Sequence, residues 1–125
     1  MLQIDSRELS ELLLRNPCTL VIDVRFDRER TEFGYIKNSR HIPLYTPDWD
    51  PNPDFIEEID KIAVRDTPLV FVCRSGNRSC EACEMVENHG YSEVYNLSEG
   101  YMGLVALKSG AAPDSDVAVL ELLAR

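Results

Sequence analysis

Short apolar runs alternate along the chain with segments that have helical spacing. Residues 19–22 and 68–72 have the length and the β-branched or aromatic content of buried strands. Two further short strands are predicted, one within residues 36–44 and one at Val94-Tyr95. Strands that alternate with helices in this way are typical of an α/β domain with a mainly parallel sheet.

Capping signals and apolar spacing predict the helices. A first helix is expected after Asp5, because Asp5 is a favourable N-cap, Glu8 follows three residues later, and Leu9, Leu12 and Leu13 share one face. Further helices are predicted over residues 27–34, 55–63, about 79–89 and 101–108, with Gly34 and Gly90 as end signals. Residues 46–53, which are rich in proline and aspartate, predict a loop.

The 125 residues form about one domain, which we place at residues 1–112. Residues 113–125 form an apolar tail that carries Val117, Val119, Leu120, Leu122 and Leu123. We predict an additional helix in this tail, packed either on the body of the domain or on a second copy. The sequence leaves monomer and homodimer open.

The charge balance argues against nucleic acid as a partner. The chain has 13 basic and 22 acidic residues and a net charge of −9, whereas neutralising phosphates requires a basic face. An anionic substrate must therefore be attracted by a local cationic patch.

No apolar stretch is long enough to cross a membrane, and the N-terminal residues lack a basic segment followed by an apolar one, so we expect a cytoplasmic location. The four cysteines are then expected to remain free thiols.

The strongest chemical signal is the segment Cys73-Arg74-Ser75-Gly76-Asn77-Arg78-Ser79, between the apolar strand at 68–72 and a predicted helix. The strand places Cys73 at the carboxyl edge of the sheet, where α/β folds bind ligands. The helix N-terminus, the loop amides and the two arginines all favour a thiolate over a thiol. A thiolate in a cationic pocket is a nucleophile, and the same pocket binds the anion that it attacks.

Several segments together resemble the rhodanese family, whose active loop typically reads C-x-x-G-x-[RST]. The run from Leu20 to Arg25 looks like the family's early strand with its Asp-x-Arg ending, and Glu32-Phe33 is similar to its acidic–aromatic pair. The other matching segments are Gly34-Tyr35-Ile36 with His41-Ile42-Pro43, the helix pattern from Ser79 to Tyr91, and Tyr95-Asn96-Leu97 with Gly100. The resemblance covers roughly residues 1–110, and none of the departures from the family pattern, such as Tyr35 for the usual histidine, falls in the loop.

The resemblance implies a rhodanese-like α/β fold, a mainly parallel sheet of about five strands flanked by helices on both faces. It also implies a sulfurtransferase in which Cys73 takes a sulfane sulfur from thiosulfate or a similar small anionic donor. The resulting persulfide passes the sulfur to cyanide or to a thiol, including one on a thioredoxin-like or sulfur-relay protein. The substrate-binding residues would be Arg74, Ser75, Gly76, Asn77, Arg78 and Ser79. No cofactor, metal or membrane is implied.

Within this site, we expect Arg74 to be exposed and to steer the donor, and Arg78 to shape the loop. Arg25 and Glu32 have the spacing of an ion pair that braces the strand end, and Asp23 is expected to cap the loop after that strand. Trp49 is interpreted as surface packing rather than as a lip over the active site.

Three other interpretations stand beside the sulfurtransferase. A cysteine-dependent phosphatase or arsenate reductase shares the strand–loop–helix arrangement, but Cys73 and Arg78 have a C-x4-R spacing, one residue shorter than the C-x5-R of phosphatases. A catalytically weak rhodanese-like sulfur carrier or redox or partner-binding module is the non-enzymatic alternative. Cys80 and Cys83 form a C-x-x-C without a second ligand pair for zinc, so Cys83 is expected in the core and Cys80 is a candidate for resolving an oxidised Cys73.

Overall fold

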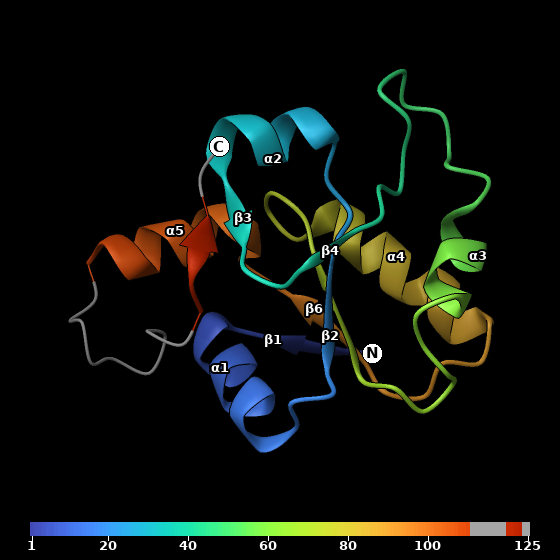
Figure 1. Cartoon of the computed structure of the whole chain (residues 1–125), viewed down its shortest axis with the longest axis horizontal. Helices are drawn as coiled ribbons and strands as arrows, with labels where there is room; N and C mark the ends of the chain where they lie inside the picture. Colours follow the sequence, from blue (N-terminus) through green and yellow to red (C-terminus); the bar gives the residue numbers. More distant parts are fainter. Residues whose placement is uncertain (111–119, 124–125) are drawn as a thin grey trace.

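The computed structural model describes residues 1–110 and 120–123 and contains a five-stranded sheet in the order β1-β6-β5-β2-β4, with every pairing parallel (Figure 1). Its strands are β1 (Leu2–Ile4), β2 (Leu20–Asp23), β4 (Arg40–His41), β5 (Leu69–Val72) and β6 (Val94–Leu97). The predicted parallel α/β architecture is thus confirmed.

Helices cover both faces of this sheet. They are α1 (Ser6–Arg15), α2 (Asp27–Phe33), α3 (Phe55–Asp60), α4 (Asn77–Asn88) and α5 (Gly100–Ser109). α1 and α5 lie on one face, where the core includes Leu9 and Leu104, and α3 and α4 lie on the other, where it includes Ile59 and Val86 (Figure 1). α2 lies at the carboxyl edge of the sheet, above the ends of the strands.

The central strand β5 is buried on both faces, as its apolar sequence predicts. Leu69 and Phe71 face α3 and α4, whereas Val70 and Val72 face α1 and α5. β5 is paired with β2 on one side and with β6 on the other. The residue that follows it, Cys73, therefore stands at the middle of the carboxyl edge.

Local signals account for where the first two helices begin and end. The Asp5 carboxylate accepts the N–H of Glu8 at 2.8 Å, and the Glu8 carboxylate accepts the N–H of Asp5 at 3.1 Å, so the predicted capping box is present. α2 ends at Gly34, whose φ of 85° lies in the left-handed region. The predicted loop at residues 46–53 is also confirmed, whereas α3 ends at Asp60, earlier than its apolar spacing indicated.

Three strands, β1, β3 (Tyr35–Ile36) and β7 (Leu122–Leu123), differ from the sequence-based expectation, whereas β4 lies within residues 36–44, where one short strand was predicted. Strand β1 was not predicted, because three residues are too few to show the alternation of apolar and polar positions that marks a strand. In the tail, Leu122–Leu123 form a short strand, β7, antiparallel to β3 (Tyr35–Ile36), rather than part of a helix. The remainder of the helix predicted for residues 113–125 falls on positions 113–119 and 124–125, outside the described residues.

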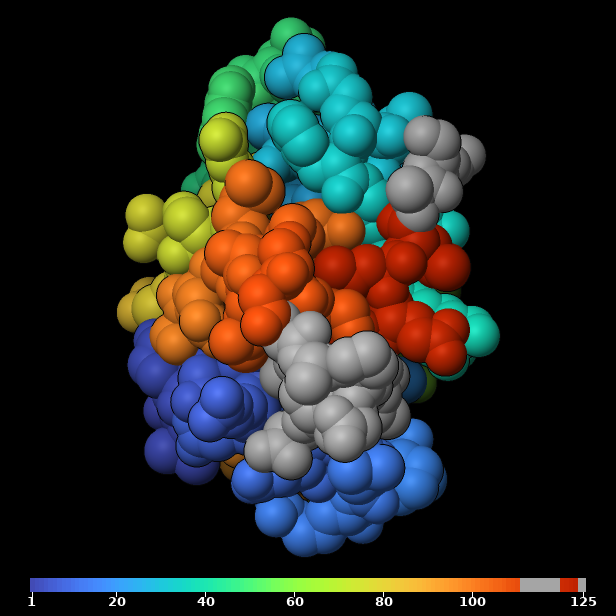
Figure 2. All heavy atoms as spheres, turned by 90° about the vertical axis from the view of Figure 1, so that its left-hand side faces the viewer, coloured from blue at the N-terminus to red at the C-terminus, as the bar shows by residue number. Residues whose placement is uncertain are grey.

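The described end of the tail packs on the domain itself. Leu120 is 1% exposed and belongs to the core on the α1 and α5 face, together with Ile36 and Tyr101. Figure 2 shows β7, in red, beside α5, in orange. Among the described residues, no helix is long and apolar enough to cross a membrane.

Candidate active site

Cys73 follows β5 directly and opens the loop of residues 73–79, here called the Cys73 loop. Gly76 turns the chain with a φ of 101° and serves as the N-cap of α4. Its N–H donates to the Cys73 sulfur over 3.0 Å, and the Ser79 hydroxyl lies 3.2 Å from the same sulfur. Two donors thus reach the sulfur, and the residue itself is 1% exposed. The sequence predicted a ring of loop amides, but within the described chain Gly76 supplies the one amide in contact with the sulfur.

A buried polar pair lies behind the sulfur. The Ser79 hydroxyl also contacts Oδ1 of Asn96 on β6, and both residues are buried. The Asn96 side-chain amide donates to the carbonyl oxygen of Gly76 at 3.1 Å and to Oε1 of Gln3 at 2.8 Å. Asn96 therefore connects the Cys73 loop to the two strands on one side of β5.

The N-terminus of α5 holds the outer side of the loop. The N–H of Tyr101 donates to the Cys73 carbonyl at 2.8 Å, and the N–H of Met102 donates to the Arg74 carbonyl at 3.1 Å. These are N–H groups that a helix cannot satisfy internally. Gly100, with a φ of 66°, packs so closely against the Arg74 carbonyl that a Cβ at this position would overlap it.

The two arginines of the loop have different environments. Arg74 is exposed and has no ion-pair partner within the described chain. Arg78 is half-buried and donates to both oxygens of the Glu29 carboxylate, at 2.7 and 2.9 Å. This pairing raises the pKa of Arg78 above its ordinary value. The charge of Arg78 is therefore largely neutralised by Glu29, and Arg74 supplies the free positive charge of the loop.

Glu29 was not predicted as a site residue. Burial by itself would raise the pKa of its carboxyl, but hydrogen bonds from Arg78 and from the N–H of Phe26 hold that pKa below its ordinary value. The predicted Arg25–Glu32 ion pair was wrong. Glu32 is exposed, whereas Arg25 binds the Asp23 carboxylate at 2.8 Å, because the short Asp-x-Arg spacing brings those two groups together.

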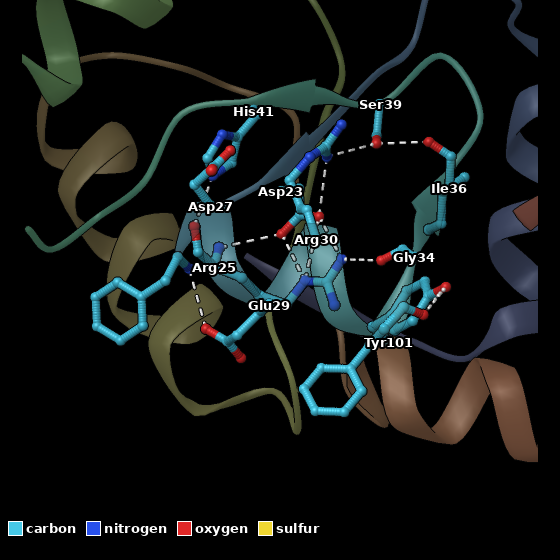
Figure 3. Close-up of polar contacts among 12 residues, drawn as sticks. Asp23, Arg25, Asp27, Glu29, Arg30, Gly34, Ile36, Ser39, His41 and Tyr101 are labelled. Atoms are coloured by element: carbon cyan, nitrogen blue, oxygen red, sulfur yellow. Dashed lines mark hydrogen bonds and ion pairs between the residues drawn. The ribbon is translucent and has the colours of Figure 1, made fainter. Parts of the chain in front are cut away.

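Figure 3 shows how this part of the chain is fixed. Asp23 accepts hydrogen bonds from Arg25 and, at 3.0 Å, from Arg30, and its carboxylate also accepts the N–H of Arg25, in the capping role expected for it. Arg25 further donates to the Gly34 carbonyl at 2.8 Å and lies over the Tyr101 ring. The middle of α2, at Arg30, and its C-terminal end, at Gly34, are therefore anchored to the residues at the end of β2. This anchoring places Glu29 opposite the Cys73 loop.

A pocket of about 400 Å³ lies beside the loop. Arg28 and Glu32 of α2, Trp49, Arg74 and Arg78 line it, together with Phe26, Glu29 and Phe33. Trp49 packs edge-on against Phe26 yet remains 59% exposed, so it forms part of the pocket wall as well as a surface contact.

The other cysteines lie away from this pocket. Cys83 is fully buried in the core, as predicted, and burial raises its pKa to about 12. Cys80 is half-buried on α4, and Cys18 is exposed. All four cysteines are free thiols.

The structure places Gly76 and Ser79 at the Cys73 sulfur and Arg74 and Arg78 in the pocket wall, whereas Ser75 and Asn77 are exposed and lie in neither set. It adds Arg28, Glu29, Asn96 and Gly100 to the predicted residues. Glu29 and Asn96 are 49 and 17 residues from their loop partners, so no local pattern could have paired them. Gly100 carried the one available signal, because it belongs to a segment that resembles the family pattern, Tyr95-Asn96-Leu97 with Gly100.

Sequence comparisons agree with this geometry. Residues 5–107 match the rhodanese-like domain family. The chain is 35% identical over 88 residues to the thiosulfate sulfurtransferase GlpE of Stutzerimonas stutzeri. The aligned residues cover 70% of this chain and 72% of that protein. It is 34% identical over 98 residues to a sulfurtransferase of Allochromatium vinosum, with 78% of this chain and 82% of that protein covered.

Solved structures show the same fold. The protein Rv0390 of M. tuberculosis superposes with a TM-score of 0.73 at 29% identity, over 81% of this chain and 80% of that one. The polysulfide-sulfur transferase of Wolinella succinogenes superposes with a TM-score of 0.71 at 21% identity, over 100% of this chain and 80% of that one. A cysteine loop at the carboxyl edge of a five-stranded parallel sheet, together with a family match over most of its length, places this chain in the rhodanese-like domain family.

Proposed function

We propose that the chain is a sulfurtransferase of the thiosulfate type, in which Cys73 carries the sulfur as a persulfide. The observation that carries this proposal is the setting of the Cys73 sulfur. It is contacted by the Gly76 N–H and the Ser79 hydroxyl, next to a pocket whose wall includes Arg74. The relatives named as sulfurtransferases support the same reaction class.

In the first half-reaction, the Cys73 thiolate attacks the outer sulfur of thiosulfate. The new bond joins Sγ to that sulfur, the S–S bond of thiosulfate breaks, and sulfite leaves with the electron pair. Arg74 is the free cation of the loop, so it would bind the sulfonate oxygens of the donor. The overall charge of −9 repels anions, which makes this local charge necessary for donor binding.

In the second half-reaction, an acceptor attacks the outer sulfur of the persulfide. The Sγ–S bond breaks, the acceptor keeps the transferred sulfur, and Sγ returns to a thiolate. Cyanide would become thiocyanate, and a thiolate would become a persulfide. The Gly76 N–H supports the negative charge that develops on Sγ.

A protein thiol is a candidate acceptor, because the pocket wall contains two large exposed apolar side chains. Phe33 is 49% exposed and Trp49 is 59% exposed, and both line the pocket beside Arg74. An apolar rim of this kind suits a protein surface better than it suits cyanide. This acceptor class would include a thioredoxin-like or sulfur-relay protein.

Phosphatase or arsenate chemistry is less well supported. Such enzymes need an arginine that is free to bind the oxyanion. In this chain, Nη1 and Nη2 of Arg78 already donate hydrogen bonds to the Glu29 carboxylate. The loop between Cys73 and Arg78 is also one residue shorter than theirs. Hydrolysis of an aryl phosphate by the purified protein would favour the phosphatase interpretation instead.

Mass spectrometry after thiosulfate treatment tests the proposal. We expect one added sulfur atom on Cys73 and none on the Cys73→Ser protein, while Cys80→Ser, altered on the adjacent helix, still takes up the sulfur. Addition of cyanide should then remove the sulfur and produce thiocyanate. Absence of both the adduct and thiocyanate would overturn the proposal.

A further inference from the structure

The Ser79 hydroxyl has two acceptors within reach but only one proton. On one side lies the Cys73 sulfur, at 3.2 Å, and on the other lies Oδ1 of Asn96. A hydroxyl donates one hydrogen bond at a time. Because Cys73, Ser79 and Asn96 are all at least 98% buried, water does not supply a replacement donor for whichever acceptor is left out.

The Asn96 side chain cannot avoid this competition by turning over. Its amide nitrogen donates to the Gly76 carbonyl and to Oε1 of Gln3. Turning the amide would place Oδ1 against the Gly76 carbonyl, whose position is set by the backbone. Oδ1 of Asn96 therefore faces Ser79 permanently as an acceptor.

We infer that Ser79 and Asn96 form a hydroxyl switch that follows the charge on the Cys73 sulfur. When Sγ is anionic, the Ser79 hydroxyl donates to it, and Asn96 Oδ1 is left without a donor. When Sγ is neutral, either as a thiol or with a second sulfur attached, the hydroxyl donates to Asn96 instead. Ser79 touches the reacting atom and acts as a catalytic residue, whereas Asn96 acts through Ser79 as a positioning residue.

This inference rests on the proposed function for its effect on sulfur transfer. In the second half-reaction Sγ is the leaving atom, so the Sγ–S bond breaks as Sγ gains the electron pair. The Ser79 proton then turns from Asn96 to Sγ and stabilises the departing thiolate, and no proton is gained or lost by the pair. In the loaded enzyme Asn96 holds the hydroxyl away from the uncharged Sγ, so the donor is available at the step that needs it.

The switch makes predictions of opposite sign for its two members. Ser79→Ala removes the donor to the thiolate, so alkylation of unloaded Cys73 by iodoacetamide at a fixed neutral pH should slow on the order of tenfold. Asn96→Leu removes the competing acceptor, so the same alkylation should become faster by several-fold. Ser79→Thr keeps the hydroxyl and should stay within about twofold of the unaltered protein.

A double variant separates the switch from structural damage. If Asn96 acts through Ser79, then Asn96→Leu should leave the alkylation rate unchanged in a Ser79→Ala background. An Asn96→Leu effect of equal size in both backgrounds would overturn the inference, as would an unaltered rate in Ser79→Ala. Asn96→Ala serves in the same cycle if the leucine variant does not fold, as judged by circular dichroism.

Sulfur transfer provides the second arm of the experiment. Protein loaded with thiosulfate and freed of excess donor is mixed with cyanide, and thiocyanate release is followed in a single turnover. Ser79→Ala should slow this release about tenfold, and Ser79→Thr should restore it. Failure of the unaltered protein to load sulfur would refute the proposed function alone, because the alkylation cycle tests the switch without any sulfur donor.

Discussion

Glu29 and Arg78 form a bidentate ion pair between α2 and the Cys73 loop, with N–O distances of 2.7 and 2.9 Å. The pair fixes the orientation of the Arg78 guanidinium, whose other neighbours are the rings of Phe26 and Trp49. It also removes most of the charge of Arg78 from the pocket. We therefore propose that Arg74 binds the donor and that Arg78 shapes the loop.

Replacement of Glu29 by Gln should destabilise the protein by about 2 kcal/mol at pH 7, because it breaks a largely buried ion pair and leaves the Arg78 guanidinium without its anion. Urea denaturation of both proteins measures this difference. Glu32→Gln is the matched control, since Glu32 is an exposed carboxylate on the same helix, and its stability should change by less than about 0.5 kcal/mol.

The effect of Glu29 should depend on pH with a definite sign. Its pKa in the folded protein lies below the ordinary value of 4.5, so the carboxylate stabilises the folded state fully above that value. This stabilisation is lost as the pH falls through the lower folded pKa. The stability difference between the unaltered protein and Glu29→Gln should thus be constant from pH 7 to pH 6 and shrink below pH 4.5. A difference that grows on acidification would contradict the ion pair.

Arg74→Ala should raise the KM for thiosulfate about tenfold and leave the unfolding free energy nearly unchanged, because Arg74 is exposed and unpaired within the described chain. Arg74→Lys keeps the charge and should recover part of the affinity. Arg7→Ala, an exposed arginine on α1, controls for net charge. Steady-state kinetics should also show activity falling as ionic strength rises, and a flat salt profile would refute the steering role.

Gly100→Ala should impair both stability and sulfur transfer. Its φ of 66° is strained for any residue with a Cβ, and the added atom would overlap the Arg74 carbonyl and crowd the Ser75 nitrogen. We expect a loss of about 2–4 kcal/mol and a clear fall in kcat, since the Cys73 loop must shift to make room. Gly110→Ala is the control, because a Cβ there meets its nearest neighbour at 4.0 Å. Wild-type kinetics in Gly100→Ala would show that this contact does not position the loop.

The sequence predicts the parts of this molecule that depend on local pattern. The apolar residues Leu69–Val72 identified the central strand, the Asp5–Glu8 spacing identified a capped helix, and Cys73 with Gly76 identified the loop. These features depend on residues that are close in the chain. The two-residue strands β3 and β7 have too few positions to show a period, whereas β4 lies within residues 36–44, where a short strand was predicted.

The partners of the loop residues could not be found in this way. Glu29 stands among several charged residues on α2, and only the fold shows that it, rather than Glu32, faces Arg78. Asn96 lies within an apolar strand, where a polar residue could equally have faced solvent. Asn96 is selected by strand order and register, because β6 is paired with β5 and brings Asn96 opposite Phe71. Glu29 is selected by the position of α2, which the contacts of Asp23 and Arg25 fix.

Leu120→Ala tests whether the tail packs on its own domain. Leu120 is 1% exposed and packs with core residues of the α1 and α5 face, and β7 after it pairs with β3. Truncation to alanine should therefore lower the unfolding free energy by about 2–4 kcal/mol, whereas Leu14→Ala, at a leucine that is 69% exposed, should change it by less than about 0.5 kcal/mol. The loss should be the same at low and high protein concentration, as measured by urea denaturation, because the contact lies within one chain. A loss that grows with protein concentration would indicate instead that the tail packs on a second copy.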